Sequence, residues 1–170
     1  MKRIPMLFVA TLTLASLATT VRGQETASAT ATATIVTPIS IVKDVDMDFG
    51  NVAVQSTTAG TVVLAPGGTR TATGGVTLPT TAGTVTAASF TVSGTSGYTY
   101  TITLPTTPLT ITSGANTMTV TAFTSDPSGT GTLTGGSEVV NVGATLNVSA
   151  AQPAGVYVSA TPFDVTVNYN

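Results

Sequence analysis

The last eight residues, Phe163-Asp-Val-Thr-Val-Asn-Tyr-Asn170, decide the fold class of this chain. Large apolar residues stand at the odd positions Phe163, Val165, Val167 and Tyr169, and polar residues stand between them. Successive side chains of a β-strand point to opposite faces, so this pattern predicts a strand with one buried and one solvated face. We therefore expect a core strand that closes the domain, with the four odd-numbered side chains packed inside.

The same alternation recurs along the chain between turn signals. Tyr98–Leu104 alternates large apolar residues with threonine, and Val140–Val148 continues the pattern across a glycine. Phe123 stands out of register with the apolar residues before it, which predicts a β-bulge. About eight to ten short strands with turns between them indicate an all-β antiparallel sandwich, with a barrel as the alternative.

The composition is typical of an exported β domain and unfavourable to catalysis. The chain has 39 threonines, no cysteine and no histidine, so it lacks disulfides, thiol chemistry and the commonest general base and metal ligand. Asp126, Glu138 and Asp164 stand singly, and Lys43 lies beside Asp44. We expect no enzyme activity and no cofactor. Residues 24–170 have a net charge of −5, which disfavours a nucleic-acid partner.

The first residues have the pattern of a secretory signal peptide. Lys2 and Arg3 precede an apolar run that ends near Ala18, and small residues follow up to Gly23. The run is too short to span a bilayer, and no later segment is longer, so we expect no membrane insertion after cleavage. We predict residues 1–23 as signal peptide, 24–34 as an N-terminal arm and 35–170 as one β-sandwich domain in a secreted, extracellular or cell-surface protein.

The arm alternates alanine with threonine or serine. Ala27, Ala29, Ala31, Ala33 and Ile35 share one parity, which Ile39 and Ile41 continue. One side of such a segment could be buried, so the arm is a candidate donor strand for the open sheet edge of a neighbouring subunit. The alternatives are a disordered linker and an ordinary first strand within the same subunit, and the pattern does not distinguish pairing within a subunit from pairing between subunits.

Two further patterns have both a functional and an ordinary interpretation. Asp44, Asp46 and Asp48 fall on one face of a predicted strand and could collect Ca²⁺, but Phe49 and Gln55 break the calcium-loop pattern, which favours a solvated strand face. Threonine rows such as Thr99–Thr103 and Thr117–Thr121 could form a hydroxyl array for glycan or ice. No fixed sequence repeat aligns them, which favours ordinary solvent-facing positions.

Several motifs occur in an order that resembles the secreted bacterial proteins grouped as domain of unknown function 4402. The resemblance covers nearly all of the chain after the predicted signal peptide, and it implies no function. The motifs are Asp46-Met-Asp-Phe-Gly-Asn-Val52, Arg70-Thr-Ala-Thr-Gly-Gly-Val76, Phe123-Thr-Ser-Asp-Pro-Ser-Gly-Thr-Gly131 and Phe163-Asp-Val-Thr-Val-Asn-Tyr169.

The chain also resembles pilin subunits of the chaperone–usher and spore-coat-protein-U type. The similar features are the step Phe49-Gly50, the turn Gly155-Val-Tyr157 and the penultimate Tyr169. The resemblance implies an incomplete immunoglobulin-like sandwich that the N-terminal arm of the next subunit completes. The chain departs from many such pilins in having no disulfide and an alanine-rich arm.

We therefore expect a structural surface protein, a pilin-like subunit of a fimbria or matrix fibre that assembles by β-strand addition. Its partner is another copy of the chain or another surface subunit. The alternative is a monomeric adhesin or glycan-binding module of unknown ligand.

Overall fold

The computed structural model describes residues 23–170, so the predicted signal peptide lies outside the described residues apart from Gly23. The chain divides into two units, residues 1–34 and residues 35–170. The second unit contains β-strands and one short 3-10 helix, Thr134–Gly136, and no α-helix is present between residues 23 and 170. Its strands are β1 Ser40–Val45, β2 Ala53–Val54, β3 Gly60–Leu64, β4 Arg70–Gly74, β5 Val76–Thr77, β6 Ala88–Ser93, β7 Thr99–Thr103, β8 Leu109–Ser113, β9 Asn116–Asp126, β10 Thr130–Thr132, β11 Ser137–Val148, β12 Val158–Ser159 and β13 Thr166–Tyr169.

The long strand β11 is the centre of an eight-stranded antiparallel sheet. One edge of β11 pairs with β6 through residues 137–142 and with β3 through residues 144–148, and the other edge pairs with β9. The inward side chains of β11 alternate as the sequence predicts: Val140, Val142, Leu146 and Val148 are all buried. Around this strand the sheet order is β1-β6-β11-β9-β8-β12, with β3 and then β4 attached beside β6.

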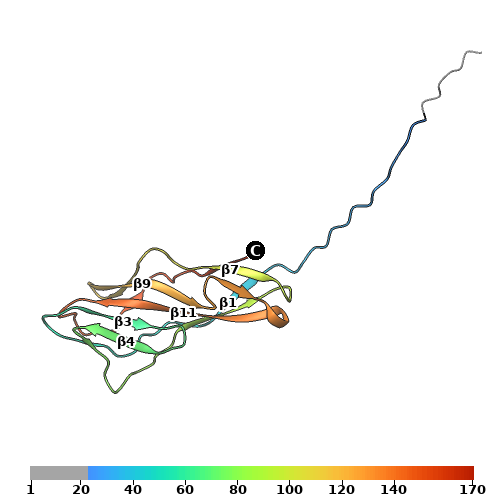
Figure 1. The fold of residues 1–170 in the computed structure, drawn as a ribbon. Coiled ribbons are helices and arrows are strands. Elements are labelled where there is room, and N and C mark those ends of the chain that lie inside the picture. Colours follow the sequence, from blue (N-terminus) through green and yellow to red (C-terminus); the bar gives the residue numbers. More distant parts are fainter. Residues whose placement is uncertain (1–22) are drawn as a thin grey trace, which may run out of the picture. The chain divides into compact units, whose positions relative to one another are not determined.

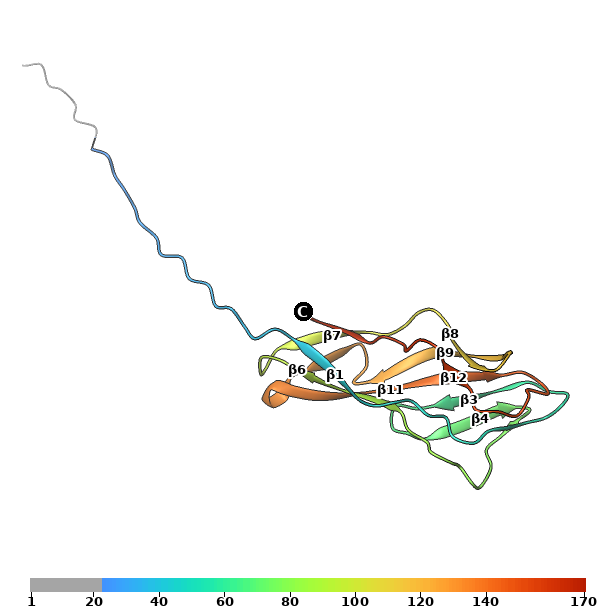
Figure 2. The same ribbon diagram turned by 180° about the vertical axis from the view of Figure 1, so that it is seen from behind.

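A smaller sheet, β10-β7-β13, packs against the β6 and β11 part of the large sheet. Tyr100 and Ile102 of β7 and Val167 of β13 share one core cluster with Phe90 of β6 and Val140 of β11. Both views place β7 at the end of the domain where β1 lies, with β3 and β4 at the other end (Figures 1 and 2). The all-β class and the antiparallel sandwich predicted from the sequence are therefore confirmed.

The closing strand is shorter than the sequence predicts, but its two faces are as expected. Only Thr166–Tyr169 pairs with β7. Val167 is buried and Tyr169, Val165 and Phe163 pack against the core, whereas Asp164, Thr166 and Asn168 are exposed. Phe163 forms no ladder, and its ring lies 5.0 Å from that of Phe123 between centroids. Residues 163–165 thus belong to the core through side-chain packing rather than through backbone pairing.

The predicted bulge at Phe123 is confirmed. Opposite β11, Thr121 pairs with Thr145 and Thr124 pairs with Gly143, so Ala122 and Phe123 together face the single residue Ala144. Ala122 takes a positive φ of 49°. The bulge turns Phe123 inward, where it packs against both core clusters of the domain.

The arm Gly23–Thr34 contains no strand, and all of its side chains are exposed. Whether Ala27, Ala29, Ala31 and Ala33 are buried against their own domain or against a neighbouring copy stays a prediction. Ile39 and Ile41, which share their parity, pack against the core, and Ile41 pairs with Val92 in the ladder between β1 and β6. Ile35 is 95% exposed. The apolar alternation thus runs from a segment without a strand, residues 23–34, into the domain's own first strand.

Candidate functional site

Two unpaired edges of the large sheet are β1 and β12, and a third is β4, which pairs only with β3. The strand order of the sheet begins at β1, which pairs only with β6, and ends at β12, which pairs only with β8. Within the described residues no second strand pairs with either of them. An unpaired strand edge presents free backbone N–H and C=O groups and is a template for another strand.

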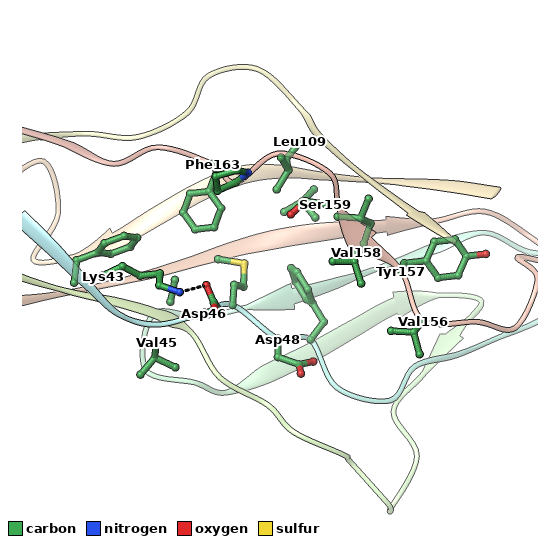
Figure 3. A pocket seen from close by; sticks show the side chains of 17 residues that line it. Lys43, Val45, Asp46, Asp48, Leu109, Val156, Tyr157, Val158, Ser159 and Phe163 are labelled. Atoms are coloured by element: carbon green, nitrogen blue, oxygen red, sulfur yellow. Dashed lines mark hydrogen bonds and ion pairs between the residues drawn. The ribbon is translucent and has the colours of Figure 1, made fainter. Parts of the chain in front are cut away.

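A groove with a volume of about 490 Å³ lies between the β1 and β12 edges. Its lining takes residues from β1, β6, β9, β8 and β12, so the sheet curls around it from one edge strand to the other. Buried Ala88, Phe90 and Val120 form part of its floor, with Ile111 and Phe163 beside them. We call this hollow the edge groove; Figure 3 shows its lining side chains.

The two rims of the edge groove differ in charge. On the β1 side, Lys43 Nζ lies 2.7 Å from Asp46 Oδ1 in an exposed ion pair, which Figure 3 draws as a dashed line. On the β12 side the rim is apolar: Val156 is 82% exposed and Val158 is 60% exposed. Such branched apolar side chains at the lip of an apolar groove lose water contact when a segment lies over them.

A second hollow, of about 550 Å³, continues the edge groove. Ile111 and Tyr157 line both hollows. One wall of the second hollow is Asn51–Val54 and the other is Gln152–Tyr157. The two hollows together therefore lie between a first wall within residues 43–54 and a second wall within residues 152–163.

Hydrogen bonds fix the turn that forms the second wall. Tyr157 Oη donates to the Pro153 carbonyl at 2.8 Å and accepts from Gln152 Nε2 at 2.9 Å. Gln152 Nε2 also lies 3.1 Å from the Thr117 carbonyl of β9. The tyrosine of the Gly155-Val-Tyr157 turn thus holds the backbone of its own wall in place.

The first wall is fixed by motif residues that are far apart in the sequence. Arg70 Nη1 donates to the carbonyls of Phe49 and Asn51, and the Gly50 N–H donates to Asp48 Oδ1 at 2.7 Å. Gly50 has a φ of 65°, a conformation that other residues rarely adopt. The segments Asp46–Val52 and Arg70–Val76, which carry the family resemblance, therefore meet in space and brace this wall.

The direction of the two edge strands limits what can lie between them. Five antiparallel pairings separate β1 from β12, so these strands run in opposite directions. One added strand is consequently parallel to one edge and antiparallel to the other. Its alternate side chains would point into the groove, and the intervening ones would face solvent.

The three aspartates of the first wall do not gather into one group. Asp44 Oδ2 accepts from Thr91 Oγ1 at 2.8 Å, Asp46 pairs with Lys43, and Asp48 accepts from the Gly50 amide. The expectation that they share a strand face is wrong, because β1 ends at Val45 and its register is irregular between Lys43 and Val45. No cluster of three potential metal-ligating acidic side chains is found among residues 23–170.

The Glu138 carboxylate accepts hydrogen bonds that connect neighbouring strands. Its Oε2 accepts from Tyr100 Oη at 2.7 Å and from the Thr132 amide at 2.8 Å. Burial, and then the neighbouring Glu138 carboxylate, raise the pKa of Tyr100 above its ordinary value. This pair ties β7, β10 and β11 together at the end of the domain away from β3 and β4.

The structure brings some of the predicted site residues to the edge groove and not others. Phe163 lines it, whereas Val165, Val167 and Tyr169 pack in the core between the two sheets. Most of the groove lining cannot be recognised in the sequence, including Ile111, Val156 and Val158. Their alternation marks them only as strand residues, and the pairing of β12 with β8 depends on residues 46 positions apart or more.

These features define a class: an all-β sandwich with two unpaired edges facing across an apolar groove. Residues 39–169 match the family described as "Domain of unknown function (DUF4402)", so the chain belongs to that family. No curated protein and no solved structure matches the chain. The structure has no helix, in the part that it describes, that is long and apolar enough to cross a membrane.

Proposed function

We propose that this protein is a secreted structural subunit of a surface fibre, assembled when the arm of one copy adds as a strand to the edge groove of the next. The observation that carries the proposal is the apolar groove between two unpaired, oppositely directed strand edges. The strand that would fill the groove is the arm of another copy. The alternating side chains of the arm are exposed through Ile35. Strand addition joins proteins through main-chain hydrogen bonds and through pockets for alternate side chains.

The small apolar side chains of the arm suit an apolar groove. Ala27, Ala29, Ala31 and Ala33 bring small methyl groups, each worth roughly 0.8 kcal/mol when buried, and Ile35 adds about 2–3 kcal/mol. The intervening threonines and Ser28 would face solvent. Ile35 therefore contributes about as much apolar burial as the four alanines together, and it is the expected anchor.

Anchoring of the first strand favours pairing between copies over folding back within one copy. The Thr37 N–H donates to Thr95 Oγ1 at 3.0 Å, and the Thr37 carbonyl accepts from Tyr169 Oη at 2.8 Å. A hairpin that returned the arm along β1 would have to turn within Ile35 and Val36. Tight hairpin turns need residues with positive φ, which β-branched side chains disfavour.

Deleting Gln24–Thr34 tests the donor. We expect a folded chain that no longer forms fibres in electron micrographs. The matched control keeps the arm's length and composition but groups its alanines, so that the period of two is lost; we expect this chain to fail as well. Fibres that form as in the unaltered chain after deletion would contradict the proposal, and a strictly monomeric unaltered chain would favour the adhesin alternative.

Blocking the groove tests the acceptor. Val158→Asp places a charge on the groove rim, whereas Val139→Asp places one on the solvent face of β11, outside the groove lining. We expect only Val158→Asp to stop assembly. When the arm-deleted chain is mixed with Val158→Asp, the first supplies a groove and the second an arm, so one-to-one complexes should appear in sedimentation. Absence of these complexes would show that the arm and this groove are not partners.

A further inference from the structure

The outer face of the large sheet aligns threonines across five strands. In the first row Thr73, Thr61, Asn147, Thr119 and Thr110 are successive cross-strand neighbours on β4, β3, β11, β9 and β8. A second row beside it runs Thr71, Val63, Thr145 and Thr121. The sequence contains no repeat that would align these residues, so only the strand register reveals the rows. We call the nine residues the threonine face.

The threonine face is polar, uncharged and internally ordered. It has seven threonines, one asparagine and one valine, and no charged residue stands in either row. The hydroxyls of Thr61 and Thr73 lie 2.7 Å apart, and Asn147 Nδ2 donates to Thr121 Oγ1 at 2.9 Å. Hydrogen bonds within the face restrict its side-chain rotamers, which lowers the ordering cost of binding a partner.

The spacing of the face is set by sheet geometry. Residues of neighbouring strands lie about 4.8 Å apart, and outward residues along one strand about 6.7 Å apart. Each threonine hydroxyl offers one donor and two acceptor positions. A partner that exchanges water for these groups must itself carry closely spaced neutral hydrogen-bonding groups, as a polysaccharide does with its hydroxyls, because a charged group would lose hydration without meeting a counter-charge.

We propose that the threonine face is a binding surface for an uncharged polysaccharide that lies along the hydroxyl rows. A single hydroxyl exchanged for water contributes little net free energy, so a monosaccharide binds too weakly to be retained. A polymer makes many such contacts at once, and its binding accumulates through multivalency. The face belongs to one copy of the domain and does not depend on the edge groove or on assembly.

Depletion of the full chain from solution by microcrystalline cellulose tests this surface. We expect the unaltered chain to bind and Thr119→Val/Thr145→Val to bind about tenfold more weakly, as expected for the loss of two hydrogen bonds. Neither hydroxyl has a hydrogen-bond partner within the described chain, and valine preserves the β-branched shape. The matched control is Thr103→Val/Thr166→Val, an exposed cross-strand pair on the other sheet, which should bind as the unaltered chain does.

Three outcomes overturn the proposal: no binding by the unaltered chain, an equal loss in the control pair, or release by an excess of free glucose. Thermal denaturation of each variant checks that it is folded. If Thr119→Val/Thr145→Val fails to fold, Thr71→Val/Thr110→Val removes two other hydroxyls of the same face and carries the same expectation.

Discussion

The two ends of the chain have the same period of two and different structures. In the arm, alanines alternate with threonine or serine, and Gly23–Thr34 forms no strand. At the C-terminus, Phe163, Val165, Val167 and Tyr169 alternate with polar residues, and this segment packs into the core and pairs with β7. The difference lies in the size of the apolar side chains rather than in the pattern.

Side-chain size determines whether such a segment forms a strand. The burial of its apolar side chains must offset the conformational entropy that is lost when the backbone is ordered. Fixing one residue's backbone costs about 1–2 kcal/mol, and a buried alanine methyl returns roughly 0.8 kcal/mol. A valine or phenylalanine returns about 1.5–3 kcal/mol when buried. An alanine arm therefore needs both a preformed apolar groove and two rows of backbone partners before it orders, which makes it suited to a joint between subunits.

A charge in the closing strand should have the largest effect. Val167→Asp places a carboxylate in the core cluster that contains Ile102 and Phe90, without a counter-charge, and we expect it to lower the free energy of unfolding by about 4 kcal/mol or more. Ala31→Asp introduces the same charge at an apolar position of the alternating pattern in the exposed arm. It should leave the free energy of unfolding unchanged. Denaturant unfolding of both variants measures the difference. Equal stability of the two would show that β13 is not part of the core.

Larger apolar side chains in the arm should strengthen its pairing as a strand, because β13 forms a strand with large apolar side chains. We expect Ala29→Val, Ala31→Val and Ala33→Val together to strengthen self-association, because each adds about 1.6 kcal/mol of apolar burial if the groove admits it. Sedimentation equilibrium measures the association constant. The control set is Thr30→Val, Thr32→Val and Thr34→Val on the opposite face. Stronger association in the control set than in the alanine set would reverse the assigned face.

Removing one hydroxyl from the closing strand should have a moderate effect. Tyr169 Oη accepts from the Thr95 amide at 2.7 Å and donates to the Thr37 carbonyl at 2.8 Å. Tyr169→Phe leaves both backbone groups without this partner, and we expect a loss of about 1–2 kcal/mol in denaturant unfolding. Tyr98→Phe is the control, since it keeps the contact between the rings of Tyr98 and Tyr169. A larger loss in the control would contradict the role given to Tyr169.

The alkaline stability of the sheet that contains β13 should depend on Tyr100. Its pKa is raised in the folded chain above the ordinary value of 10.0, so the unfolded chain loses the proton first as the pH rises. The contribution of Tyr100 to stability should be constant below about pH 10 and then fall by about 1.4 kcal/mol per pH unit until the phenol of the folded chain also ionises. In Tyr100→Phe this particular slope disappears. Urea unfolding at several alkaline pH values measures it, and an unchanged slope in the variant would assign the effect to another group.

Much of the core was predictable because large apolar residues must avoid water. Val140, Val142, Leu146 and Val148 are buried as predicted, and so is Val167. The bulge at Phe123 was also predictable, since one extra residue shifts the parity of every side chain after it. The positions of the three aspartates in the first wall were not predictable, because a register irregularity in β1 separates residues that a regular strand would align.

The candidate site was predictable only in part. The arm is visible in the sequence as an alternating segment, and all of its side chains are exposed in the structure. The groove is not visible, because its floor and rims come from five strands whose order around the sheet is set by long-range pairing. The rows of the threonine face likewise depend on the register of β4, β3, β11, β9 and β8.

The sequence by itself determined the all-β class, the inward face of the main strands and the alternation of both chain ends, because these follow from local periodicity and side-chain hydrophobicity. The tertiary structure alone decided that β1 and β12 remain unpaired and face each other across an apolar groove. Which edges stay open depends on pairing between distant segments, and no local pattern of residues contains that information.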